Sequence, residues 1–162
     1  MVLTFITDDD PKVCARNLDY KRLGKQKLEC KWIINSIESK KNNKHPGYLM
    51  WEGYLNYLKH YTNCIIEEWL RRGYKNTMEI YSLPSEFEKP WFFTYRPLQL
   101  THICSLKRKD SNYYNNVFPN SPEITQYMTI GYLWPTKISL EILELMKKNK
   151  CENPKTYCQL LS

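Results

Sequence analysis

The sequence predicts an all-α fold, a single compact domain of about four to five helices with long irregular connections. Two observations predict helices: apolar side chains recur at steps of three and four residues within residues 30–37 and again within residues 50–69. A third observation is that no two segments show the apolar–polar alternation typical of paired strands. The 162 residues fit one domain, 1–162, and a chain of this length can bury a core without disulfides or metals.

The first helix is expected over residues 11–39. Three aspartates stand directly before Pro11, an arrangement typical of a helix N-terminus, and the second half of this segment is amphipathic. The turn residues of NNKHPG at 42–47 predict a loop. A second, longer apolar stripe then predicts a helix over residues 48–72 that ends at Gly73.

The remainder of the chain predicts shorter elements. Three prolines indicate an irregular segment over residues 76–97, and a helix is expected over residues 98–109. The stretch NYYNNVFPNSPE at 112–123 is typical of a loop, and GYLWP at 131–135 of a tight aromatic turn. A last helix is expected over residues 139–150.

Composition favours a polyanionic partner. The net charge is +7, and basic proteins of this kind commonly bind nucleic acid, although the same charge also serves plain solubility. Thirteen tyrosines and five tryptophans can stack on bases, but they can equally fill a core. The charge and the aromatic residues are therefore informative only where they lie together.

The six cysteines form no C-x-x-C pair, and no histidine pair has zinc spacing. The N-terminus is too short and too acidic for a signal peptide, and no apolar run is long enough to span a membrane. We therefore expect an intracellular protein (cytoplasm or nucleus, or a virion if viral) that is not secreted, with no metal, no membrane association and reduced cysteines in its core.

The stretch LDYKRLGKQKLEC at 18–30 combines several basic residues with a glycine and an acid. On a helix, residues at steps of three and four share one face, here Asp19, Arg22, Gln26 and Glu29. Lys25 lies beside them. Gly24 costs about 1 kcal/mol relative to alanine in mid-helix, so we expect a bend or the close approach of another backbone, such as a nucleic-acid strand. The alternative is an exposed face with ordinary ion pairs.

Basic and aromatic residues also interleave later in the chain, at His102, Lys107, Arg108, Lys109, Tyr113 and Tyr114, followed by Tyr132 and Trp134. Such residues can bind phosphates and stack on unpaired bases. The alternative is a solvated helix end next to a tyrosine-rich loop. His45, just before Pro46, is a candidate DNA contact, and a lone histidine at such a position more often caps a turn.

Five motifs follow one another along the chain: L-D-x-x-R-L-G-K-Q-x-x-E at 18–29, N-K-H-P at 43–46, E-E-W-L-R-R-G-Y at 67–74, L-K-R-K-D-x-x-Y-Y at 106–114 and G-Y-L-W-P at 131–135. In order and spacing they resemble the pyrimidine-dimer DNA glycosylases, the phage endonuclease V type, and in particular their bacterial and viral relatives. The resemblance covers about residues 2–135. It implies an all-α fold, double-stranded damaged DNA as the partner, and chemistry that needs no metal or cofactor.

The resemblance also implies a DNA repair glycosylase with abasic-site lyase activity. In that family the α-amine of the processed N-terminus attacks C1′ of a damaged nucleotide, a Schiff base forms, and β-elimination breaks the strand. Such an amine has a pKa of about 7.7–8.0, so it is partly neutral and nucleophilic near neutral pH. The nucleophile would be the amine of Val2 after removal of Met1, or that of Met1 if it is retained.

A glutamate on the first long helix organises the sugar and the proton transfers in that family. One alignment puts Arg22 at the position of this acid, whereas counting back from His45 puts Glu29 there. We favour Glu29, with Asp19 as the alternative. The resemblance implies further DNA contacts, made to phosphates or to an extruded base, from Arg22, Lys25, Gln26, His45, His102, Lys107, Arg108, Tyr132 and Trp134.

The sequence departs from the family pattern at two places, and both departures bear on which substrate the protein recognises. Leu3 stands where the family pattern has a basic residue, and the chain ends in CENPKTYCQLLS instead of an aromatic and basic tail. Two other functions remain open from the sequence. One is a nucleic-acid-binding or architectural protein without catalysis, and the other is a nuclease or base-modifying enzyme of different chemistry.

Overall fold

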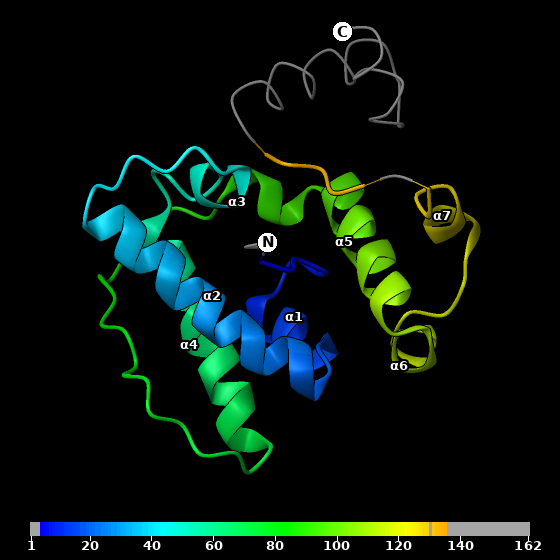
Figure 1. Cartoon of the computed structure of the whole chain (residues 1–162), viewed down its shortest axis with the longest axis horizontal. Coiled ribbons are helices and arrows are strands. Elements are labelled where there is room, and N and C mark those ends of the chain that lie inside the picture. The colour runs from blue at the N-terminus through cyan, green and yellow to red at the C-terminus, as the bar shows by residue number, and fades with distance from the viewer. Residues whose placement is uncertain (1–3, 130, 136–162) are drawn as a thin grey trace, which may run out of the picture. The chain divides into compact units, whose positions relative to one another are not determined.

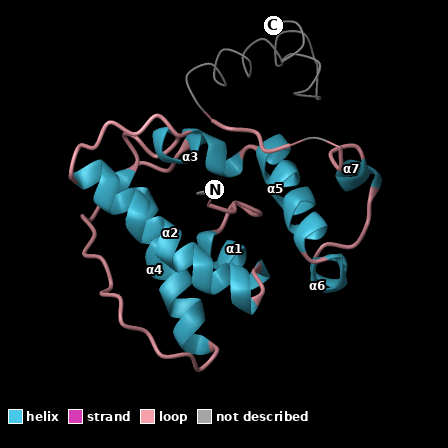
Figure 2. Ribbon diagram, in the orientation of Figure 1, coloured by secondary structure: helices cyan, strands magenta, loops and turns pink. Residues whose placement is uncertain are grey.

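The computed structural model describes residues 4–129 and 131–135, and every regular element in this part of the chain is a helix (Figure 1). The elements are α1 Pro11–Asn17, α2 Tyr20–Glu38, α3 Pro46–Leu49, α4 Leu55–Arg71, the 3₁₀ helix Trp91–Thr94, α5 Arg96–Lys109, α6 Ser111–Val117 and α7 Pro122–Thr125. Figure 2 shows loops between them and no strand in the described ranges. The all-α prediction is confirmed.

The chain divides into two compact units, Met1–Thr94 and Tyr95–Ser162. The first contains α1 to α4 and the second α5 to α7. The expectation of a single domain therefore stays a prediction.

The prediction of one continuous helix over residues 11–39 is wrong, because the structure has two helices there, α1 and α2. The side chain of Asp10 accepts a hydrogen bond from the Lys12 amide (2.8 Å) and caps α1, as the aspartates before Pro11 predicted. Leu18 is extended and buried, and Asp19 then caps α2. The Asp19 side chain accepts hydrogen bonds from amides of the following turn. Such an aspartate favours the start of a new helix over the continuation of the preceding helix.

The second predicted helix, 48–72, is also divided. Its first turn belongs to the short α3, and α4 begins only at Leu55. Gly53 lies between them with a φ of +83°, a conformation that glycine adopts at little cost. The predicted end is confirmed, because Gly73 follows α4 with a φ of +84°.

The core of the first unit lies between α4 and the two helices α1 and α2. On α4 the predicted stripe is buried and includes Leu58, Tyr61 and Ile65. On α2, Ile33 and Ile34 face the same core. Each fully buried aliphatic side chain of this size contributes about 1.5–3 kcal/mol to folding, so this packing holds α2 in place.

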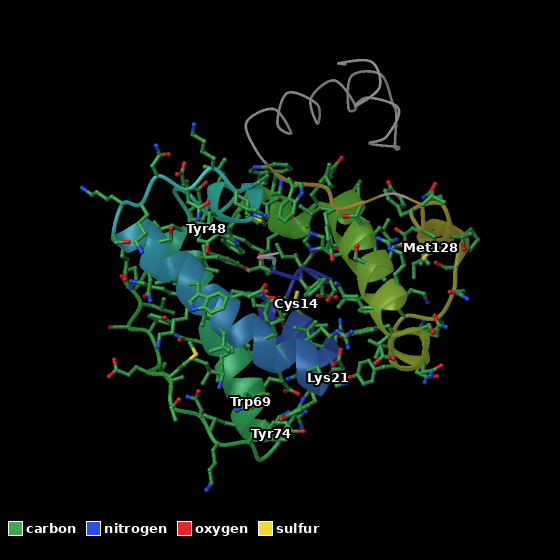
Figure 3. All side chains as sticks on the ribbon, in the orientation of Figure 1. Cys14, Lys21, Tyr48, Trp69, Tyr74 and Met128 are labelled. Atoms are coloured by element: carbon green, nitrogen blue, oxygen red, sulfur yellow. The ribbon has the colours of Figure 1, made fainter. Side chains whose placement is uncertain are left out.

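Gly24 has a different explanation from the expected bend or nucleic-acid approach. A Cβ atom at this position would lie 3.0 Å from the ring of Trp69. The glycine therefore gives room for a tryptophan of α4 to lie against α2. Figure 3 labels Trp69 near the end of α4, close to Tyr74, and the two ring centroids are 4.5 Å apart.

The second unit contains the predicted helix 98–109, which begins two residues earlier as α5. The loop predicted over residues 112–123 is wrong, because α6 and α7 form there. Asp110 and Ser121 cap these helices by accepting hydrogen bonds from the amides of Tyr113 and Ile124. The helix predicted over residues 139–150 lies outside the described residues.

The core of the second unit contains Leu100, Ile103, Cys104, Ile124 and Tyr127. Residues 131–135, the predicted aromatic turn, have no regular secondary structure.

The cysteines of the described residues are core side chains, as expected. Cys14, Cys30, Cys64 and Cys104 are buried free thiols. Burial raises the pKa of Cys14 and of Cys30 to about 12, so neither thiol is ionised near neutral pH. Cys151 and Cys158 lie outside the described residues.

Candidate functional site

The segment that leads away from the N-terminus is held against α2 and α4. The Phe5 amide donates a hydrogen bond to Oε1 of Gln26 on α2 (2.8 Å). Its carbonyl accepts one from the Tyr61 hydroxyl on α4 (2.7 Å). The indole of Trp51 donates to the Thr4 hydroxyl (3.0 Å). All five residues are buried, so the course of the chain at Thr4 and Phe5 is well defined.

Glu29 lies one helical turn beyond Gln26 on α2. It is only 5% exposed, and its Oε1 forms an ion pair with Nζ of Lys25 (3.5 Å), whose side chain is 68% exposed. Burial raises the pKa of Tyr61 well above 10, and the charge of Glu29 adds to that effect. The ion pair with Lys25 connects the buried carboxylate of Glu29 to a basic side chain at the surface.

Asp19, the alternative acid, has a structural task. Its Oδ1 accepts hydrogen bonds from the amides of Lys21 (2.9 Å) and Arg22 (3.2 Å). Its Oδ2 accepts one from the Arg22 guanidinium (3.3 Å). Asp19 therefore has a structural role as the cap of α2, and the choice between Glu29 and Asp19 as the acid stays a prediction.

Val2, the predicted nucleophile, lies outside the described residues, as do Met1 and Leu3. The first described residue, Thr4, is two positions further along the chain.

Two polar side chains of α2 are turned inward. Gln26 is 2% exposed and holds Phe5, a placement that favours a positioning role over the predicted DNA contact. Lys27 is 8% exposed; its ammonium donates to Oδ1 of Asn76 (3.1 Å) and lies 4.6 Å from the centre of the Trp69 ring. Burial lowers the pKa of Lys27. The surface charge of this helix therefore comes from its other basic residues.

The remaining basic residues of the opening stretch are at or near the surface. Lys21 and Lys25 are exposed, and Arg22 is half-buried beside Asp19. The predicted phosphate contacts of Arg22 and Lys25 are thus compatible with their positions.

His45 caps α3. Its Nδ1 accepts a hydrogen bond from the Gly47 amide (3.0 Å), and its own amide donates to Oδ1 of Asn43 (3.0 Å). This is the structural role that the sequence offered as the alternative. A DNA contact of His45 stays a prediction.

The other predicted contacts belong to the second unit, where His102 and Lys107 are packed inside. His102 is fully buried, and burial lowers its pKa to about 3, so the imidazole is neutral at physiological pH. Lys107 is 4% exposed and its ammonium donates to the Phe118 carbonyl at the end of α6 (2.6 Å). These placements favour packing and capping roles over the predicted phosphate contacts.

Arg108 is exposed, and its guanidinium donates to the Met128 carbonyl and the Ser105 hydroxyl (2.8 Å each). Tyr132 and Trp134 are half-buried with ring centroids 5.8 Å apart. All three residues belong to the second unit.

The sequence did not single out Phe5, Trp51 or Tyr61 as parts of the site. From the sequence, Tyr61 is one member of the apolar stripe within residues 50–69. The polar group of a tyrosine or tryptophan could have identified them. When such a residue is buried at the centre of an apolar stripe, its hydroxyl or indole N–H needs a hydrogen-bond partner.

No group of three or more His, Cys, Asp and Glu side chains that could hold a metal ion occurs among the described residues. None of the described helices is long and apolar enough to cross a bilayer.

Comparison with families of known proteins gives one match. The model of the pyrimidine dimer DNA glycosylase family matches residues 2–82, half of the chain, including the N-terminal segment and α1 to α4. The matched residues lie within the first unit. Neither the curated proteins nor the solved structures contain a match.

Proposed function

The chain belongs to the pyrimidine dimer DNA glycosylase family, and from that premise we propose that it couples base removal to cleavage of the strand at the resulting abasic site. The proposed nucleophile is the α-amine of Val2, and the proposed acid is Glu29. The proposed substrate is double-stranded DNA that carries a pyrimidine dimer or an abasic site.

The observation that carries this proposal is the hydrogen bond between the Phe5 amide and Gln26 (2.8 Å). Three residues separate this amide nitrogen from the amine of Val2, and three residues span at most about 11 Å. Gln26 and Glu29 are three positions apart on one helix, so their Cβ atoms are about 5–6 Å apart. The amine of Val2 can therefore reach the carboxylate of Glu29.

The proposed reaction uses the amine without a metal or cofactor. Its nitrogen attacks C1′, the glycosidic bond breaks, and the base leaves with its bonding electrons and takes up a proton. The sugar ring then opens to a Schiff base. Loss of a proton from C2′ expels the 3′ phosphate, and water releases the sugar and regenerates the amine. Glu29 would move protons at the sugar, and its ion pair with Lys25 keeps a cation beside the proposed site.

Borohydride trapping tests the proposal directly. Borohydride reduces a Schiff base to a stable secondary amine, so the protein should form a covalent adduct with duplex DNA that carries an abasic site. An extension before Val2 should abolish the adduct because it removes the free amine at this position. Proteolytic removal of the same extension should restore the adduct, which controls for folding.

Failure to trap an adduct with any damaged duplex would reject the lyase mechanism. Binding to the duplex without an adduct would instead identify a nucleic-acid-binding protein without catalysis. An adduct that survives the extension would exclude the amine of Val2 as the nucleophile.

A further inference from the structure

The outward face of α2 carries a row of exposed side chains next to Glu29. The row consists of Lys21, Lys25, Leu28 and Trp32, at steps of four, three and four residues, so all four lie along one side of the helix. Glu29 borders this row, since it follows Lys25 by four positions and precedes Trp32 by three. We refer to these four residues as the α2 ridge.

Trp32 is the unusual member of the α2 ridge. It is 55% exposed, whereas Trp51 is fully buried and Trp69 lies against Gly24 and donates its indole N–H to the Lys75 carbonyl (2.9 Å). Within the described residues, the indole of Trp32 makes no hydrogen bond and no ring contact. More than half of the Trp32 side chain is therefore left in water beside the exposed Leu28, and neighbouring exposed apolar side chains of this kind can form a binding surface.

The charges around the α2 ridge identify the partner. Lys21 and Lys25 belong to the ridge, and Lys31 is exposed next to Trp32. The neighbouring acid, Glu29, is paired with Lys25. A row of cations with an exposed aromatic ring is complementary to a nucleic-acid strand, in which phosphates alternate with flat bases.

The dimensions of the α2 ridge agree with this partner. Trp32 follows Lys21 by eleven positions, which corresponds to about 16 Å along the helix axis. At about 3.4 Å per nucleotide, the α2 ridge extends over about five nucleotides of one strand. A base beside the lesion and the phosphates that flank it lie within this length.

We propose that Trp32 stacks on an unpaired base next to the lesion, while Lys21 and Lys25 bind phosphates of the same strand. The inference rests on the proposed function, because it places the lesion beside Glu29. It adds a residue that recognises the disrupted stack, since in an intact duplex every base is covered on both faces and offers no free surface to the indole.

The experiment measures binding and needs no catalysis. The probe is a duplex with one tetrahydrofuran abasic-site analogue, which has no aldehyde and cannot form a Schiff base, and the reference is the intact duplex. Fluorescence anisotropy gives the affinity of each. Trp32→Ala should weaken binding to the analogue by about 10- to 100-fold and should change binding to the intact duplex much less.

Two variants control the measurement. Trp32→Phe keeps an aromatic face and should retain most of the affinity for the analogue. Ile80→Ala removes another side chain of the first unit that is also 55% exposed, and should leave both affinities unchanged. The exposed positions of both side chains predict that each variant stays folded, which circular dichroism verifies.

Equal affinity of Trp32→Ala and the wild type for the analogue overturns the inference, as does an equal loss on both duplexes. If the wild type still yields the borohydride adduct, the proposed function stands without Trp32. A wild type that neither prefers the analogue nor forms the adduct overturns both. That outcome would favour a protein over a nucleic acid as the partner of the α2 ridge.

Discussion

At the scale of single residues, Gln26 connects the start of the chain to the helix that carries Glu29. One end of its amide accepts a hydrogen bond from Phe5, and the residue is 2% exposed. A buried polar side chain of this kind is costly to remove, because its partner would then be left without a hydrogen bond. The proposed site therefore depends on a buried side chain that positions the start of the chain.

Glu29→Gln separates the proposed chemistry from binding. The substitution keeps the size of the side chain but removes the carboxylate that would move protons. Strand cleavage at an abasic site should fall by about 10²- to 10⁴-fold, while affinity for the duplex stays close to that of the wild type. Single-turnover cleavage and anisotropy measure the two effects.

Glu38→Gln is the matched control, since Glu38 is on the same helix but is 47% exposed and pairs with Lys59 (2.7 Å). It should cleave like the wild type. Unchanged cleavage in Glu29→Gln would refute the assignment of Glu29, and a fall of the same size in both variants would indicate a general effect on the helix.

The residue types of the site could be predicted from the sequence, but their burial could not. Spacing placed Asp19, Gln26 and Glu29 on one face of a helix, and all three are buried in the structure. The partners that turn Gln26 and Lys27 inward are remote in sequence: Phe5 is 21 positions away and Asn76 is 49 positions away. A periodicity argument uses only neighbours on the helix, so it cannot identify such partners.

At the scale of elements, the end of α4 is tied to the end of α1. Glu68 is 5% exposed and accepts hydrogen bonds from Arg71 (2.7 and 2.8 Å) and Arg72 (2.7 Å). Arg72 also donates to the Arg16 carbonyl at the end of α1 (3.1 Å). A cation at a helix C-terminus interacts favourably with the carbonyls there. The E-E-W-L-R-R-G-Y motif is therefore largely explained by packing.

Glu68→Gln should destabilise the protein in a pH-dependent way. The hydrogen bond from Arg71 holds the pKa of Glu68 below its usual 4.5. The folded pKa is thus lower than the unfolded one, so the stabilisation is fully present above pH 4.5 and is lost as the pH falls through the folded pKa. At pH 7 the variant should lose about 2 kcal/mol of unfolding free energy.

Urea unfolding at neutral pH and at about pH 3 measures the difference, which should shrink in acid. The neighbouring Glu67→Gln is the control. Glu67 is 58% exposed and its ion pair with Lys12 is 3.9 Å long, so the substitution should change the free energy of unfolding by less than about 0.5 kcal/mol. A difference that persists unchanged in acid would contradict the ion-pair explanation.

The existence of the long helices could be predicted, for α4 from a strong apolar stripe, but the breaks between the helices could not. α5 begins two residues before its expected start, whereas α4 ends close to its expected end but begins seven residues late, at Leu55. The division between α1 and α2 depends on whether Asp19 bonds to the amides ahead of it, which periodicity does not report. The helices α6 and α7 are short, and their asparagine, tyrosine and proline residues are equally typical of loops.

At the scale of the whole molecule, the net charge of +7 does not by itself explain recognition of DNA. The residues matched by the family, 2–82, lie in the first unit together with Glu29 and the α2 ridge. In the second unit, His102 and Lys107 are buried. We therefore expect that phosphate contacts made by particular side chains of α2 contribute more to affinity than the total charge does.

The salt dependence of binding distinguishes these two contributions. Each phosphate contact adds about −0.9 to the slope of log affinity against log salt concentration. Lys25→Ala should reduce the magnitude of this slope by about 0.9 for the duplex with the abasic-site analogue. Lys12→Ala changes the net charge by the same amount, but Lys12 is on α1 and pairs with Glu67, so the slope should stay unchanged. Equal reductions in both variants would show that affinity follows net charge, and no change in either would exclude a phosphate contact at Lys25.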